Sequence, residues 1–239
     1  MEESKRILMV VANPATSTTV GGPVGFWASE LTHAYYEFRQ AGYEVTIASP
    51  NGGKVEFDAL SDPRDASGYS KDDVLSLGYI HSEEFMALLE DTPAVSTFSP
   101  DDFDAIVVAG GQAPMFTFDK AAELQSLFAG FYRHGKVSAA LCHGTSLLLY
   151  LKDEEGAPLV KGKTMTGFAN SEEDYVDHVV GRKVMPFRIE DEAKKLGANY
   201  VSKGPFEPFA IRDGHLITGQ QQNSGKATAE LVIEALNGR

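Results

Sequence analysis

The only cysteine of the chain, Cys142, lies in the stretch VSAALCHGTSLLL, residues 137–149. A hydrophobic run precedes it, and His143 and Gly144 follow it. A free cysteine is often a small buried hydrophobe. Here, however, it stands between an expected strand and an expected helix, where the first amides of the helix and its dipole favour a thiolate. The position predicts a nucleophile.

Glu30 is the first acid–base candidate. The segment GFWASELTHAYYEF has an apolar stripe at helical spacing through Trp27, Leu31, Ala34 and Phe38. Glu30 follows Trp27 by three residues and precedes Ala34 by four, so it lies inside the stripe. A carboxyl group buried there titrates high or is hydrogen-bonded, whereas one at the edge of the stripe reaches solvent. Periodicity leaves both readings open.

His143 and a pair of glycines are further candidates. Neighbours on a helix do not face each other, but at a sharp turn His143 can swing beside the cysteine if a carboxylate orients it. The stretch SEEDYVD at 171–177 offers several acids, although such runs are usually solvated. Gly110 and Gly111 follow a buried run, where their amides can stabilise an oxyanion.

Short buried strands alternate with helices along the chain, which predicts an α/β fold with a doubly wound, mostly parallel sheet and helices on both faces. We expect one domain over 1–239, with 50–80 as an insertion or cap. The loop after Ala12, Gly110-Gly111 and Cys142 all follow strands, so they should meet at one sheet edge. The expected strands are 6–12, 44–49, 105–109, 137–141 and 163–166, the helices are 25–41, 81–90, 119–133, 143–152, 186–196 and 224–236, and a hairpin joins 209–212 to 215–218 through Asp213-Gly214.

Composition narrows the classes of function. Lys plus Arg is 21 and Asp plus Glu is 34, so the net charge is 21 − 34 = −13, which argues against nucleic acid and anionic membranes as partners. A single cysteine cannot form an internal disulfide, and the first residues lack a secretory signal, so we expect a cytoplasmic protein. GGPVG at 21–25 lacks the dinucleotide spacing and the remaining histidines form no ligand set, so we predict no cofactor and no metal.

Several motifs together resemble one family. AALCHG after a buried strand, the early glutamate, AGG at 109–111 and GKTMTGFANSEE resemble the ThiJ/PfpI superfamily, the cysteine branch of the class I glutamine-amidotransferase-like fold. DEAKKLGANYVSKGPF and FAIRDGHLITG resemble its larger heat-shock-type members, which include glutathione-independent glyoxalases (glyoxalase III). The resemblance runs from RILMVVA to TAELVIEAL and implies a flavodoxin-like sandwich and a homodimer.

The resemblance also assigns roles to residues. It implies that Cys142 is the nucleophile, Glu30 the buried carboxylate at the thiol, and His143 the adjacent histidine. The third acid follows Thr166-Gly167-Phe168, where Glu173 matches best and Glu172 competes; Gly111, next to Gly110, would supply the oxyanion amide. Two departures leave the substrate open: Gln112-Ala113 stands where many relatives continue Gly-Gly with His-Gly, and TGQQQNSG lacks the usual Asn-Pro.

The resemblance implies a cofactor-free lyase that converts methylglyoxal or a related small 2-oxoaldehyde to a 2-hydroxy acid. A cysteine hydrolase or amidase is the second hypothesis, although no His-Pro-Glu triad end is present near the C-terminus. A stress-related holdase or redox sensor is the third, since an accessible low-pKa cysteine is readily oxidised.

Overall fold

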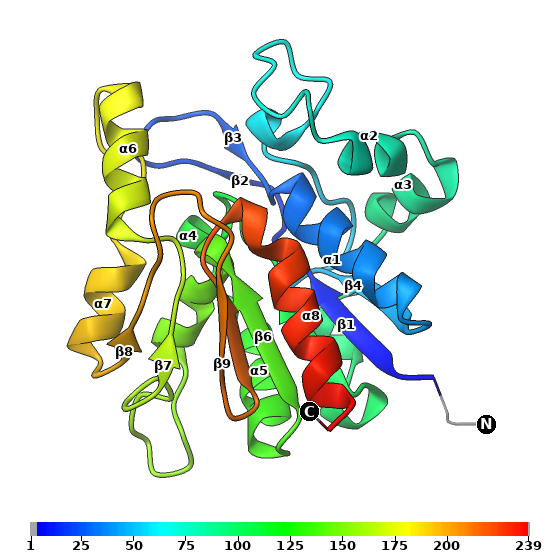
Figure 1. The fold of residues 1–239 in the computed structure, drawn as a ribbon, viewed down its shortest axis with the longest axis vertical. Helices are drawn as coiled ribbons and strands as arrows, with labels where there is room; N and C mark the ends of the chain where they lie inside the picture. The colour runs from blue at the N-terminus through cyan, green and yellow to red at the C-terminus, as the bar shows by residue number, and fades with distance from the viewer. Residues whose placement is uncertain (1–3, 239) are drawn as a thin grey trace.

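The computed structural model describes residues 4–238. Its centre is a six-stranded sheet in the order β4-β1-β5-β6-β10-β9 (Figure 1). All neighbouring strands are parallel except β9, which pairs antiparallel with β10. The predicted mostly parallel α/β sheet is therefore confirmed. The strands of this sheet are β1 (Arg6–Val10), β4 (Glu44–Ala48), β5 (Ala105–Val108), β6 (Val137–Leu141), β9 (Ala210–Asp213) and β10 (Leu216–Gly219).

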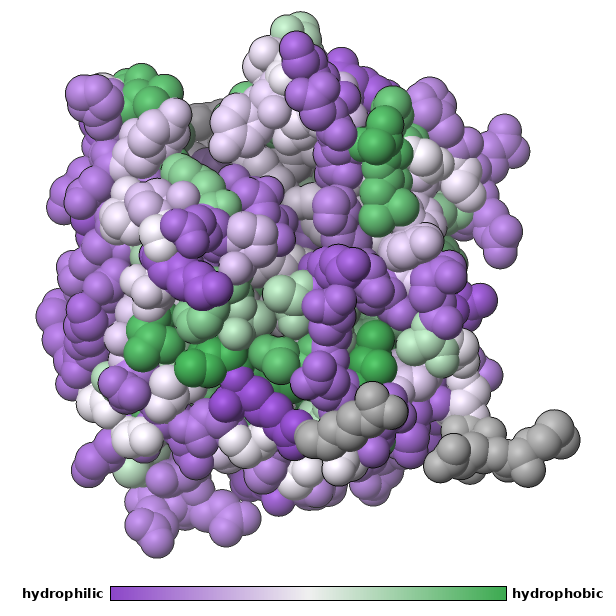
Figure 2. Space-filling model, in the orientation of Figure 1, coloured by the Kyte–Doolittle hydropathy of each residue, from purple (hydrophilic) through white to green (hydrophobic). Residues whose placement is uncertain are grey.

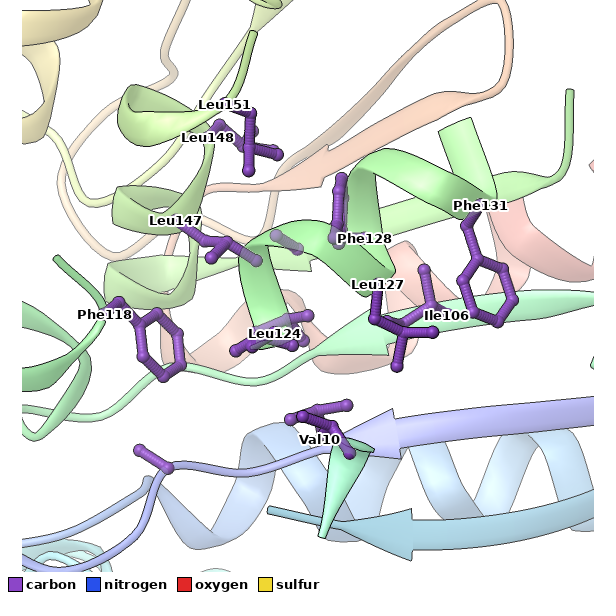
Figure 3. Close-up of a cluster of buried hydrophobic side chains, with 14 of the residues drawn as sticks. Val10, Ile106, Phe118, Leu124, Leu127, Phe128, Phe131, Leu147, Leu148 and Leu151 are labelled. Atoms are coloured by element: carbon purple, nitrogen blue, oxygen red, sulfur yellow. The ribbon is translucent and has the colours of Figure 1, made fainter. Parts of the chain in front are cut away.

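Helices cover both faces of the sheet, and the alternation of side chains along each strand explains why. Ile7 and Met9 of β1 pack toward α1 and α8, while Leu8 and Val10 face α5. Figure 3 shows the cluster on the α5 face of the sheet, in which Phe128 of α5 lies among leucines of the segment after β6. The helices are α1 (Ala28–Gln40), α2 (Val74–Ile80), α3 (Glu83–Glu90), α4 (Pro114–Thr117), α5 (Ala122–Arg133), α6 (Asn170–Val180), α7 (Ile189–Lys195) and α8 (Gly225–Leu236).

Smaller elements lie in the connections. Two strand pairs, β2 (Ala15–Thr16) with β3 (Pro23–Val24) and β7 (Thr164–Met165) with β8 (Asn199–Tyr200), form separate ribbons. The 3₁₀ helices are η1 (Ala59–Ser61), η2 (Val95–Thr97), η3 (Pro100–Asp102), η4 (Cys142–Tyr150) and η5 (Gln222–Ser224).

The structure corrects two of the expected elements. The first helix begins at Ala28, so Trp27 precedes it and is only partly buried. The segment after Cys142 is a 3₁₀ helix. Two segments for which the sequence predicted no element also contain helices: the acidic run at 171–177 belongs to α6, and the segment 50–80 contains η1 and α2.

Strand register brings the candidate residues to one edge. Val10 of β1 pairs with Val108 of β5, and Val108 pairs with Ala140 of β6. Gly110 and Cys142, each two residues further on, therefore leave the sheet side by side, as expected for carboxyl ends of parallel strands. The predicted hairpin is also present, with Gly214 at φ 64° in its turn.

Within residues 4–238, no helix combines the length and the apolar character that a bilayer span requires.

Phe128→Ala should lower the free energy of unfolding by about 3–5 kcal/mol, because Phe128 is fully buried between α5 and the sheet. Leu88→Ala, at a leucine that is 42% exposed, is the control and should change it by less than about 0.5 kcal/mol. Urea denaturation measures both, and equal losses would contradict the core described here.

Candidate active site

Cys142 occupies a strained turn between β6 and η4. Its φ is 55°, in the left-handed region that residues with a side chain rarely adopt. Two glycines make the turn sterically feasible. A Cβ on Gly110 would lie 2.9 Å from the Cβ of Cys142, and one on Gly144 would lie 2.6 Å from the carbonyl oxygen of Ala109. The turn therefore holds the thiol at the end of the sheet.

Glu30 lies directly beside this thiol. It is fully buried in the first turn of α1, and its Oε2 accepts a hydrogen bond from the Gly110 amide at 2.6 Å. Burial raises the pKa of Glu30 to about 8, although hydrogen bonds from Cys142 and Gly110 oppose the rise. Of the two readings left open by the sequence, the structure supports the desolvated carboxyl group inside the stripe.

The Cys142 thiol does not have the depressed pKa that we expected from a helix start. Burial raises its pKa well above the ordinary value, and the nearby Glu30 raises it further, although the amides of His143 and Gly111 point to the sulfur and lower it. We had expected the amides and dipole of a following helix to act on the thiol without a neighbouring acid. The structure places a carboxyl group at the thiol, so the resting pair holds its protons and Glu30 is the group positioned to accept the thiol proton.

His143 is oriented by Glu173. Its Nε2 lies 2.9 Å from Oε1 of Glu173, and its Nδ1 lies 4.0 Å from Sγ of Cys142. If the carboxylate accepts from Nε2–H, the Nδ1 lone pair faces the thiol. Phe168 packs on the imidazole with ring centroids 4.2 Å apart. The structure thus brings Cys142, His143 and Glu173 into one connected group.

Glu172, the competing acid, has a different place. Its carboxylate accepts hydrogen bonds from the amides of Ala169 and Phe206 and from Nε2 of Gln220, at 2.8–2.9 Å. It therefore caps α6 and ties this helix to the segment before β9, whereas Glu173 is the acid that contacts His143.

The two glycines after β5 differ in what their amides do. The Gly110 amide donates its hydrogen bond to Glu30. Contrary to our prediction, it is therefore not available to an oxyanion of the substrate. The Gly111 amide points to the sulfur. Gly111 has a φ of 99° and lies against the backbone of Phe26 and Trp27, where there is no room for a Cβ. Gly111 and the amide of His143 are therefore the two donors at the position where an oxyanion on a sulfur-bound carbon would lie.

Asp58 is a site residue that the sequence did not reveal. It is 1% exposed and accepts hydrogen bonds from the amides of Gly25 at 2.9 Å and Gln112 at 2.6 Å. Burial raises its pKa to about 6, against the effect of those two amides and of His143. Asp58 thus joins the loop before α1 to the Gly110–Gln112 loop. It lies in the segment 50–80, whose lack of periodicity gave no signal.

A cavity of about 510 Å³ opens above Cys142 and His143. Its walls come from α6 and the loop after it, from the loop between β2 and β3, and from the segment 50–80, which contributes Leu60, Ser67 and Tyr69. Gln112 also lines it. Among residues 4–238, no group of three or more His, Cys, Asp or Glu is arranged to hold a metal ion.

This chain is similar to one known protein family over most of its length. The DJ-1/PfpI family is matched by residues 22–235. The chain belongs to the DJ-1/PfpI family. This confirms the ThiJ/PfpI resemblance and places the Cys142 turn, Glu30 and the Gly110–Gly111 loop inside the matched region of this DJ-1/PfpI protein.

Named relatives of this DJ-1/PfpI protein point the same way. Glyoxalase 3 of Candida albicans is 31% identical over 97% of this chain and 98% of its own. Glutathione-independent glyoxalase HSP31 of Saccharomyces cerevisiae is 32% identical over 90% and 91%. The crystal structure of glyoxalase III from Candida albicans superimposes with a TM-score of 0.79 at 30% identity, covering 97% of both chains. Rapid Encystment Protein 24 kDa of Francisella tularensis gives 0.86 at 27% identity, covering 97% and 99%.

The raised pKa of Glu30 predicts how Cys142 reacts with iodoacetamide at different pH values. In the wild type the alkylation rate should rise as the pH passes through about 8, where Glu30 loses its proton and can accept that of the thiol. Glu30→Gln should abolish this step, because the amide cannot accept the proton. Alkylation rates from pH 6 to 10, read by mass spectrometry, test this. An unchanged step near pH 8 in Glu30→Gln would contradict it.

Glu173→Gln and Glu172→Gln are matched changes at adjacent positions with opposite expected effects. Glu173→Gln should slow alkylation of Cys142 at least about tenfold, because an amide does not stabilise the imidazolium form of His143. Glu172→Gln should leave the rate within about twofold but lower the free energy of unfolding by about 1–3 kcal/mol, since it turns an amide donor toward other donors. Reversed effects would exchange the two roles.

Proposed function

We propose that this protein is a glutathione-independent glyoxalase that converts methylglyoxal or a related 2-oxoaldehyde to a 2-hydroxy acid. The observation that carries the proposal is the buried thiol–carboxyl pair of Cys142 and Glu30 beside His143. The names of its relatives, Glyoxalase 3 and glutathione-independent glyoxalase, support the same activity.

The first step forms a bond to sulfur. Once Glu30 has lost its own proton, its carboxylate accepts the thiol proton while Sγ of Cys142 attacks the aldehyde carbon, and the carbonyl electron pair moves to oxygen. The amides of Gly111 and His143, which point to the sulfur, stabilise this oxyanion until it takes up a proton. The product is a hemithioacetal, and glutathione is unnecessary because the protein supplies the thiol.

The second step moves hydrogen between two carbons. A base removes the proton from the former aldehyde carbon, giving an enediol, and a proton returns to the neighbouring carbon. The result is a thioester with an adjacent hydroxyl group, so one carbon is oxidised and its neighbour is reduced with no external oxidant. Glu30 and His143 are the two bases that the site offers; His143 is supported by the Nδ1 lone pair that Glu173 directs to the sulfur.

Hydrolysis completes the cycle. Water attacks the thioester carbon, the C–S bond breaks, and the 2-hydroxy acid leaves as Cys142 regains its proton. A cytoplasmic location stays a prediction from the sequence, and a homodimer stays a prediction from the family resemblance.

The test is conversion of methylglyoxal to lactate without glutathione. The wild type should turn over, and Cys142→Ala should lose activity completely, because no other thiol exists in the chain. Circular dichroism checks that the variant is folded. Residual turnover by folded Cys142→Ala, or none by a wild type whose cysteine still alkylates, would contradict the proposal.

A further inference from the structure

The cavity above Cys142 is much larger than methylglyoxal requires. Methylglyoxal has five non-hydrogen atoms, which occupy on the order of 150 Å³ at the volume per heavy atom of liquid water. The cavity holds about 510 Å³, and cavities of this size bind considerably larger ligands. A three-carbon substrate would leave most of it to solvent.

Most of the walls of this cavity are apolar. Helix α6 contributes Tyr175, Val176, Val179 and Val180, and η1 contributes Leu60 on the other side. We call the space between these two walls the apolar chamber. No lysine or arginine of the described residues lines it, and the carboxylate of Glu173 at its floor is held by His143. The chamber therefore offers no counter-charge to a charged group.

The apolar chamber is also open to a ligand from outside. Val179 is 65% exposed, Val180 is 49% exposed and Leu60 is 41% exposed. In Figure 2 the upper edge of the molecule is hollowed between α6 and the loop of residues 62–73, and hydrophobic residues lie on the α6 side. Apolar side chains that stay exposed around a cavity are typical of binding surfaces.

Connectivity decides what occupies the chamber during the reaction. A substrate bound to Sγ of Cys142 has its first carbon at the cavity floor, next to the amides of Gly111 and His143. Glu30 and Gly110 close the side toward α1. The space between α6 and Leu60 is then open to the substituent on the second carbon.

We propose that the apolar chamber is a subsite for an uncharged alkyl or aryl substituent, so that 2-oxoaldehydes with such substituents are better substrates than methylglyoxal. This inference rests on the proposed function for the reaction itself. Each methylene group moved from water into such a chamber improves binding roughly threefold to fourfold, whereas a charged substituent finds no partner there.

The experiment is a series of straight-chain 2-oxoaldehydes with methyl, propyl and pentyl substituents. We expect kcat/KM to rise at least about tenfold from methyl to pentyl, because four methylene groups enter the chamber. A parallel series of iodoacetamides with N-methyl, N-propyl and N-pentyl groups measures the same preference as a rate of Cys142 alkylation, without turnover.

Matched leucine variants locate the effect. Leu60→Ser removes part of the chamber wall and should reduce the pentyl-to-methyl ratio at least about threefold in both series. Leu88→Ser is the control, because Leu88 is 42% exposed, close to the 41% of Leu60, but lies on α3 outside the cavity. Val179→Ser on the opposite wall should act like Leu60→Ser and guards against a folding defect at one position.

The two series separate this inference from the proposed function. Turnover of methylglyoxal with no chain-length preference in either series would overturn the subsite and keep the function. A chain-length preference in alkylation without turnover of any 2-oxoaldehyde would overturn the function, and with it the assignment of the substituent to 2-oxoaldehydes. Equal effects of Leu60→Ser and Leu88→Ser would also overturn the subsite.

Discussion

Glu30 and the Cys142 thiol share a space from which water is excluded, and two neighbouring groups there cannot both lose their protons without large cost. The pair therefore rests protonated, with the pKa of Glu30 raised to about 8. Reaction begins when one of these protons is gone and the other moves from sulfur to carboxylate. The site thus has a protected thiol at rest and a nucleophile beside a base when a carbonyl carbon arrives.

The surrounding fold maintains this pair through backbone contacts. The positive φ of Cys142 requires glycine at 110 and 144, and the Gly110 amide in turn holds the carboxylate of Glu30. Asp58 fixes the next part of the same loop through the Gln112 amide. Parallel strands bring these segments together, because β5 and β6 end in register. In this fold, backbone contacts at the carboxyl ends of the strands hold the reactive groups in place, and few other side chains are needed.

Periodicity and strand endings predicted much of this arrangement, because they reflect local geometry. The stripe through Leu31 and Ala34 made Glu30 a candidate for burial, which the structure confirms, and the run before Cys142 predicted the thiol at a sheet edge. Glu173 and Glu172 differ by one step on a helix that the sequence reading did not expect, so only the three-dimensional structure separates them. The pKa of the thiol was predicted in the wrong direction, because it depends on Glu30, which lies 112 residues away in the sequence.

The central claim is that Cys142 carries the substrate through the reaction. Acid quenching of the wild-type enzyme during turnover of methylglyoxal, followed by peptide mass spectrometry, tests it directly. We predict an adduct equal in mass to one substrate molecule on the peptide containing Cys142, decaying as the 2-hydroxy acid forms. Turnover at full rate with no adduct on Cys142 at any quench time would contradict the account.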